Sequence, residues 1–271
     1  MTRLNAMFER TRARGEVALL PYLTAGFPDR STSPALLQAI LRGGADGMEI
    51  GIPFSDPMAD GLTLQKANQR ALDDGATTDT AFELAAGVRR LSADAPIVLM
   101  GYYNSILAPG LDRFCGAAAD AGADALVVPD LPPEECAQLR NACLANGQAY
   151  VLMLAPTSTP ERIRLVAELA GGFIYCVALA GVTGARASLS SAVGPFLSRV
   201  REATGTPLVV GFGISQPEHV RALQGQADGA IVASALADLA ERTPAADRAN
   251  AIAKRVQELK LASLPATAGS I

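Results

Sequence analysis

Residues 48–61 read MEIGIPFSDPMADG, a short apolar stretch that runs directly into a loop. The first half, MEIGI, has the length and composition of a buried β-strand. The second half holds Pro53 and Pro57 and ends at Gly61, and these residue types stop regular structure and stiffen the loop. The same change from apolar strand to loop recurs along the chain, and this recurrence predicts the fold.

Seven further apolar runs have the same character, and helical patterns stand between them, most of them closing at a glycine. Strands that are apolar throughout are buried on both faces, and helical crossovers between them make a sheet parallel. Eight such units predict a closed (β/α)₈ barrel, which is an α/β fold of the TIM-barrel type. The expected strands are residues 18–23, 47–52, 97–102, 125–130, 149–154, 173–179, 208–214 and 229–234.

A weak internal repeat favours the barrel. The segments GGADGMEI, AGADALVV and GQADGAIV each place Ala-Asp just before an expected strand, although turns before strands can favour such residues without any repeat. A doubly wound sheet is the alternative, but it usually has a glycine-rich loop after its first strand, and LTAGFPDRS is not one. No linker divides the chain. We therefore expect residues 1–271 to form one TIM-barrel domain with an extra N-terminal helix and a frayed tail after about residue 262.

The composition excludes several classes of function. The chain has 271 residues, of which 49% are hydrophobic and 18% charged, and its net charge of -4 offers no basic surface for nucleic acid. No apolar run approaches the ~20 residues of a membrane-spanning helix, and the N-terminus lacks the apolar segment of a signal peptide. We expect a cytoplasmic protein that binds neither nucleic acid nor membrane.

The cysteines and the single histidine do not form a metal-binding pattern. Cys115, Cys136, Cys143 and Cys176 stand in apolar contexts without a CxxC pair, so no metal is expected. Free cysteines of this kind behave as small core residues in a reducing compartment. His219 follows SQPE in what reads as the first turn of a helix, where we expect a solvated side chain and not a catalytic base.

Two acids fall where a barrel enzyme has its active site. Active sites of TIM barrels lie at the C-terminal ends of the strands, which places Glu49 near the mouth and Asp60 in the loop that follows. A carboxylate between Met and Ile is costly to bury as an ion, so Glu49 needs a partner, a raised pKa or a solvent-lined pocket. Two acids in different surroundings suit separate acid and base roles. The alternative is that Asp60 caps a helix and Glu49 is satisfied within the core.

Other strand ends carry glycine-rich loops that suit an anion and large side chains that suit an aromatic-sized pocket. Glycine-rich loops and a short helix at the end of the barrel form the phosphate site of many TIM barrels, which predicts Gly184, Gly213 and Ser234 around an anion. These glycines could equally relieve crowding at barrel corners. Several large side chains at strand ends could line a pocket, although each alone is more often a core residue: Tyr22, Met100, Tyr102 and Tyr175.

The runs IPFSDPMADG, YYN, VPDLPPEE, AGVTGA and GFGIS, in this order, resemble the tryptophan synthase alpha chain family over nearly the whole sequence. The resemblance implies a lyase that cleaves indole-3-glycerol phosphate by a retro-aldol reaction to indole and glyceraldehyde 3-phosphate. It implies no cofactor, since pyridoxal phosphate is expected on a partner beta chain in an alpha2beta2 tetramer. It also implies that Glu49 and Asp60 are catalytic. The implied substrate-binding residues are Tyr22, Met100, Tyr102, Tyr175, Thr183 and Phe212, and the implied phosphate-binding residues are Gly184, Gly213, Ala233 and Ser234.

The sequence departs from the family's usual pattern at several positions in expected loops. Leu62 and Ser105 stand where proline is usual, and Ala178-Leu179 where Ser-Arg is usual, so we expect weak coupling to a beta chain. Ala233 stands where glycine is usual, and its methyl would crowd the phosphate or, if φ there is positive, strain the backbone. A stand-alone lyase, a non-catalytic barrel that activates a beta chain and a different phosphosugar enzyme remain as alternatives.

Overall fold

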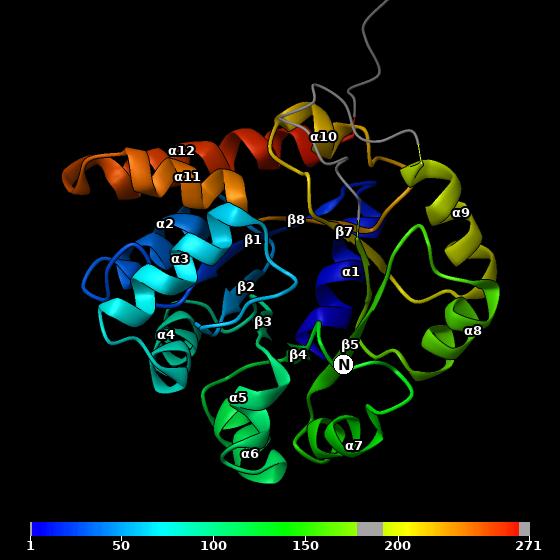
Figure 1. Cartoon of the computed structure of the whole chain (residues 1–271). Coiled ribbons are helices and arrows are strands. Elements are labelled where there is room, and N and C mark those ends of the chain that lie inside the picture. Colours follow the sequence, from blue (N-terminus) through cyan, green and yellow to red (C-terminus); the bar gives the residue numbers. More distant parts are fainter. Residues whose placement is uncertain (1, 178–191, 266–271) are drawn as a thin grey trace, which may run out of the picture.

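The computed structural model describes residues 2–177 and 192–265, and within them eight parallel strands close into a barrel (Figure 1). Each strand pairs with the next one in chain order, and β8 pairs with β1. The predicted TIM barrel is therefore confirmed. The strands are β1 Ala18–Thr24, β2 Met48–Gly51, β3 Ile97–Met100, β4 Ala125–Val127, β5 Ala149–Leu154, β6 Ile174–Val177, β7 Leu208–Gly211 and β8 Gly229–Val232.

Helices surround the barrel, as the ring of coils in Figure 1 shows. Helices α2, α3 and α6 turn back toward the sheet at Gly44, Gly75 and Gly122, whose φ angles of 88°, 77° and 91° are accessible to glycine at no steric cost. The outer helices are α2 Ser33–Arg42, α3 Leu62–Asp73, α4 Thr78–Leu91, α5 Tyr103–Leu107, α6 Leu111–Asp120, α7 Ala137–Ala145, α8 Pro160–Leu169, α9 Val193–Ala203, α10 Pro217–Arg221, α11 Ser234–Arg242 and α12 Ala245–Ser263.

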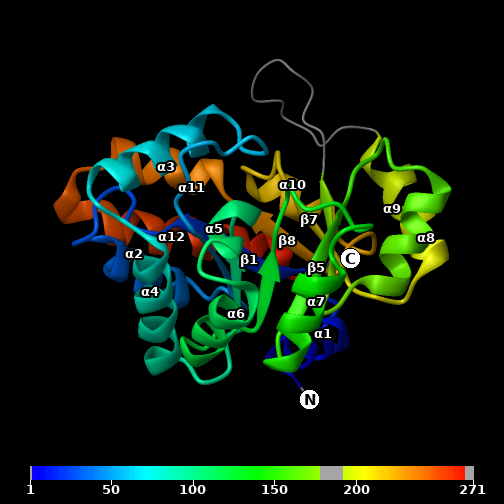
Figure 2. The ribbon, with the colours of Figure 1, turned by 60° about the horizontal axis from the view of Figure 1, so that its bottom comes forward.

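The expected N-terminal helix is α1, Arg3–Ala13, and it closes the end of the barrel where the strands begin. Its apolar side buries Leu4, Met7 and Phe8, and the Phe8 ring packs edge-on against Phe173, just before β6, with 6.1 Å between centroids. Figure 2 shows α1 on the side of the barrel opposite α3 and α10. The other end of the barrel is thereby left as the open one.

The Ala-Asp repeat has a common structural role at this closed end. Asp46, Asp124 and Asp228 each stand just before a strand, and each accepts a backbone N–H from the strand that precedes it in the barrel. The donors are Leu19, Ile97 and Leu208, at 2.9, 2.8 and 2.8 Å. Basic side chains complete each site: Lys260 at Asp46, Arg3 and Arg89 at Asp124, and Arg12 and Arg201 at Asp228.

We expect Asp124→Ala to destabilise the fold by about 3 kcal/mol, because it leaves the half-buried Arg89 and the Ile97 N–H without their carboxylate. Urea unfolding followed by circular dichroism measures this loss. Glu161→Ala is the matched control, since its pair with Arg164 is exposed on both sides and should contribute little. Equal unfolding midpoints for the two variants would contradict a structural role for the repeat.

The last described helix runs close to the C-terminal end of the described residues. Helix α12 continues to Ser263, whose hydroxyl donates to the carbonyl of Lys260 at 2.8 Å. Residues 266–271, on which the expected fraying falls, lie outside the described residues. Among the helices that the structure describes, none is both long and apolar enough to cross a membrane.

Candidate active site

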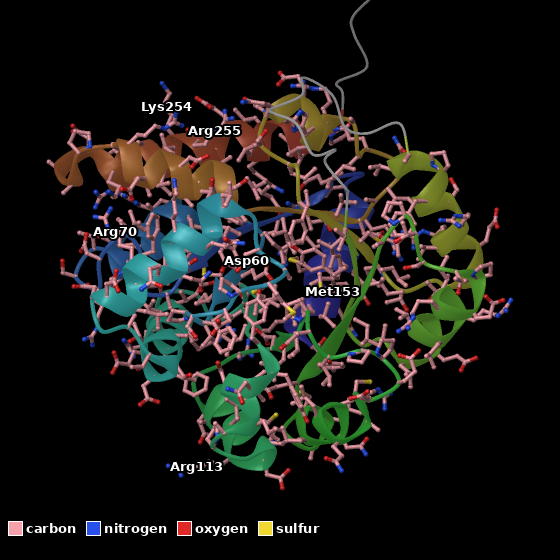
Figure 3. All side chains as sticks on the ribbon, in the orientation of Figure 1. Asp60, Arg70, Arg113, Met153, Lys254 and Arg255 are labelled. Atoms are coloured by element: carbon pink, nitrogen blue, oxygen red, sulfur yellow. The ribbon has the colours of Figure 1, made fainter. Side chains whose placement is uncertain are left out.

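A cavity of about 300 Å³ opens at the C-terminal ends of the strands. It brings together side chains that are up to about two hundred positions apart in the sequence, because every parallel strand ends at this face. Figure 3 shows Asp60 inside the ring of helices, whereas Arg70, Arg113 and Lys254 lie at the periphery. The residues that the sequence singled out and that line this cavity are Tyr22, Glu49, Asp60, Met100, Tyr175, Phe212, Gly213, Ala233 and Ser234.

Two tyrosines form part of the cavity wall, and each lies over a glycine of a neighbouring strand. A methyl group added to Gly51 would overlap the Tyr22 ring, and one added to Gly211 would overlap the Tyr175 ring. Burial raises the pKa of both tyrosines well above the ordinary value, so their hydroxyls stay protonated. The glycines therefore make room for neutral aromatic groups at the mouth of the barrel.

Glu49 lies in β2 with only 2% of its surface exposed. Its Oε2 atom has no hydrogen-bond partner among the described residues. Burial is the main cause that raises the pKa of Glu49 to about 8, and the negative charge of Asp60 is the second cause. Glu49 is therefore a protonated acid near neutral pH, with a buried oxygen free to exchange a proton with a ligand.

Asp60 lies in the loop between β2 and α3 and has two polar neighbours. Asn68 of α3 donates from Nδ2 to Asp60 Oδ2 at 3.2 Å. Burial raises the pKa of Asp60 to about 6, while the polar groups of Tyr102 and Asn68 limit the rise. Its Oδ1 atom has no partner among the described residues. Asp60 is thus ionised at neutral pH and presents a free acceptor to the cavity.

Asn68 is a residue that the sequence reading missed. It is 2% exposed, and its side chain forms hydrogen bonds with three parts of the site. Its Oδ1 accepts a hydrogen bond from the N–H of Phe54 at 3.0 Å, and its Nδ2 donates to Asp60 and to the carbonyl of Leu64. A polar residue on the apolar inner face of α3, next to Leu64 and Ala67, was the available signal. Asn68 fixes the loop that carries Asp60.

Tyr102 has a different position from the one expected. It is 1% exposed and lies behind the loop, where its hydroxyl accepts the N–H of Ala59 at 3.1 Å and its ring stacks on Phe54 with 5.1 Å between centroids. It is not among the residues that line the cavity. In this arrangement Tyr102 supports Asp60 instead of forming the cavity wall.

Another part of the cavity wall has the features of an anion site. Ser234 begins α11, and the first N–H groups of a helix have no acceptor within the helix and carry its positive dipole end. The turn after β7 holds Phe212 and Gly213 at φ angles of 69° and 77°. Ala233 has a φ of -117°, so the expectation of positive-φ strain there is wrong, and crowding by its methyl stays a prediction.

Some expected residues lie outside the part of the chain that the structure describes. Thr183 and Gly184 fall in residues 178–191, as do Ala178 and Leu179. Their expected contributions to the site and to partner coupling therefore stay predictions.

His219 is not solvated, contrary to expectation. Its side chain is 3% exposed, and its Nδ1 accepts the backbone N–H of Ser215 at 3.2 Å. Helix α10 buries His219 and Val220 and packs against α12, and this packing removes His219 from water. The four cysteines are buried and free, as expected. Within residues 2–177 and 192–265, no group of three or more His, Cys, Asp and Glu side chains could hold a metal ion.

Comparison with known proteins identifies the family. The sequence matches the family "Tryptophan synthase alpha chain" over residues 8–265. The chain belongs to the tryptophan synthase alpha chain family. Members of this family are lyases of tryptophan biosynthesis that cleave indole-3-glycerol phosphate, and the chain therefore has the alpha-chain role in that synthesis.

Relatives and solved structures agree over almost the full length. The chain is 51% identical to the tryptophan synthase alpha chain of Roseiflexus sp. (strain RS-1), covering 90% of this chain and 94% of the relative. It is 47% identical to that of Chloroflexus aurantiacus, covering 96% and 97%. The crystal structure of tryptophan synthase subunit alpha from Legionella pneumophila superimposes with a TM-score of 0.89 at 32% identity, covering 97% of this chain and 98% of that one.

Proposed function

We propose that this chain cleaves indole-3-glycerol phosphate with Glu49 and Asp60 as its catalytic residues. The observation that carries the proposal is the pair of buried acids in one cavity, one protonated and one ionised near neutral pH. The proposed binding mode places the indole ring against Tyr22, Met100 and Tyr175. The phosphate then lies at the turn after β7 and at the N-terminus of α11, with Thr183 and Gly184, which follow β6 in the sequence, as further phosphate-site residues.

The retro-aldol step needs three proton-related events, and the two acids can supply them. The protonated Glu49 gives its proton to indole C3, while the ionised Asp60 accepts a hydrogen bond from the indole N–H and stabilises the positive charge that develops there. The bond between C3 and the glycerol side chain then breaks, and its electron pair returns to the indole ring. The side-chain hydroxyl becomes the aldehyde of glyceraldehyde 3-phosphate, and its proton goes to Glu49. The enzyme is thereby restored, with no cofactor of its own.

A beta chain is the proposed partner, in an alpha2beta2 tetramer in the cytoplasm, with pyridoxal phosphate on the beta chain. Met58, in the loop that carries Asp60, and Leu62, at the start of α3, are large apolar side chains that are 79% and 76% exposed, which supports docking at this face. We propose that coupling to the beta chain is modest. Leu62 is the first residue of α3, a position where proline would stiffen the loop that enters the helix, and Leu179 lacks the charge of the arginine usual in the family.

Indole release from indole-3-glycerol phosphate, measured with and without a beta chain, tests the function. Release by the chain alone that rises on adding the beta chain supports the proposed role. Release that is unaffected by a beta chain indicates a stand-alone lyase. No release under either condition, together with faster catalysis by the beta chain, indicates a non-catalytic activator, and no effect of any kind points to another phosphosugar substrate.

The pH–rate profile of the enzyme should be bell-shaped. Catalysis needs Asp60 ionised and Glu49 protonated, so kcat/KM should fall below about pH 6 and above about pH 8. The phosphate of the substrate also titrates near ~6, so the alkaline limb is the diagnostic one. A profile that stays flat from neutral pH to pH 9.5 would contradict the assigned protonation of Glu49.

A further inference from the structure

The turn after β7 is held from one side by the last helix. Arg255 of α12 donates from Nη2 to the backbone carbonyl of Ser215 at 2.6 Å and to Oε1 of Gln216 at 2.7 Å. Its Nη1 pairs with Glu258 at 3.0 Å, and its side chain is 20% exposed. Figure 3 labels Arg255 where α12 passes α10. A guanidinium held by three acceptors is well fixed, so it can anchor the backbone that it contacts.

The backbone N–H of Ser215 is held by a buried histidine. The Ser215 N–H donates to Nδ1 of His219, on α10, at 3.2 Å. Nε2 of His219 is buried without a hydrogen-bond partner among the described residues. A buried nitrogen left unpaired is costly, so this position is occupied by histidine at the expense of stability. Both backbone groups of Ser215 are therefore engaged by side chains from two different helices.

The turn needs such support because its backbone is unfavourable. Phe212 has a φ of 69°, in the left-handed region that side-chain-bearing residues rarely adopt, and Gly213 follows with 77°. On the upstream side Gly211 pairs with Val177 of β6. On the downstream side Ile214 is buried, and Ser215 is the first residue fixed by side-chain hydrogen bonds.

We propose that Arg255 and His219 are positioning residues for the phosphate of the substrate. By fixing Ser215 they hold the Phe212–Gly213 turn in the shape that presents it to the phosphate, although neither side chain lines the cavity. This inference rests on the proposed function, because it takes the turn to be the phosphate site.

Arg255→Ala tests the inference, with Lys254→Ala as the matched control. Lys254 is the preceding residue of α12, carries the same charge and is exposed at the periphery (Figure 3). For Arg255→Ala we expect roughly tenfold increases in the KM for indole-3-glycerol phosphate and in the Kd for glycerol 3-phosphate. The kcat and the Kd for indole should stay within about twofold of the wild type, since the two acids and the ring pocket are untouched. Lys254→Ala should match the wild type throughout.

Conservative variants separate positioning from simple loss of stability. Arg255→Lys keeps one donor for the Ser215 carbonyl and should recover part of the affinity. His219→Leu should weaken glycerol 3-phosphate binding, and His219→Asn, whose Oδ1 can accept in place of Nδ1, should restore it. If Arg255→Ala does not fold, the glycerol 3-phosphate affinities of Arg255→Lys and of the His219 variants test the positioning role instead. Unchanged phosphate affinity in these variants, or equal losses for glycerol 3-phosphate and indole, would overturn the inference.

The experiment also distinguishes this inference from the proposed function. Failure of the wild type to release indole would refute the proposed reaction, whereas glycerol 3-phosphate binding can still be measured by calorimetry on the same proteins. A wild type that releases indole, with Arg255 and His219 variants of unchanged KM, would refute only the positioning role.

Discussion

Glu49→Gln should abolish cleavage of indole-3-glycerol phosphate while the substrate still binds. The amide is nearly isosteric with the protonated carboxyl that burial favours at this position, so the cavity should keep its shape. It cannot give or receive the proton, and loss of a general acid–base group costs at least ~10²-fold in rate. Single-turnover indole release measures the chemical step, and equilibrium binding of the substrate measures the site.

A matched control for this variant is Glu83→Gln, which makes the same chemical change on the exposed side of α4 and should keep the wild-type rate. Retention of a tenth or more of the activity by Glu49→Gln would remove Glu49 from the mechanism.

The same variant should change how stability depends on pH. The pKa of Glu49 rises from 4.5 to about 8 on folding, so the stability this group contributes is present below pH 4.5 and is lost as the pH rises toward 8. Glu49→Gln has no such loss, and it should therefore gain stability relative to the wild type between pH 5 and pH 9. Urea midpoints at these two values measure the difference, and no relative gain at pH 9 would contradict the raised pKa.

Asp60→Asn should lower the rate about 10²-fold with a small effect on substrate affinity. The amide oxygen can still accept the indole N–H, but the negative charge that stabilises the developing positive charge is gone. Asp56→Asn is the control, because Asp56 is an exposed acid of the same loop, and its side chain hydrogen-bonds only Ser55 among the described residues. A wild-type rate for Asp60→Asn would refute electrostatic stabilisation by this residue.

Asp60→Asn should also change the pH dependence of the remaining activity. The negative charge of Asp60 is the second cause of the raised pKa of Glu49, after burial. Removing this charge should therefore lower the pKa of Glu49 and move the alkaline limb of the residual activity to lower pH. An unmoved alkaline limb would show that the two carboxyl groups do not interact.

The sequence by itself determined the architecture of this protein. Apolar runs such as residues 97–102 and 149–154 lack polar alternation, which requires burial on both faces, and helical crossovers between eight such runs admit few topologies besides a closed parallel barrel. That architecture places the ends of all strands on one face, so Glu49 and Asp60 could be assigned to a common mouth before any contact was known. The motif IPFSDPMADG then indicated the family.

Only the tertiary structure decided the chemical state of the site and its supports. The protonation of Glu49 depends on burial from every direction and on the charge of Asp60, neither of which is a local property of the chain. The polar groups next to Asp60, those of Asn68 and Tyr102, come from different elements of the barrel. The local helical pattern around His219 likewise predicted a solvated side chain, because it contains no information on distant elements. The burial of His219 accompanies the packing of α10 against α12, which a local pattern does not contain.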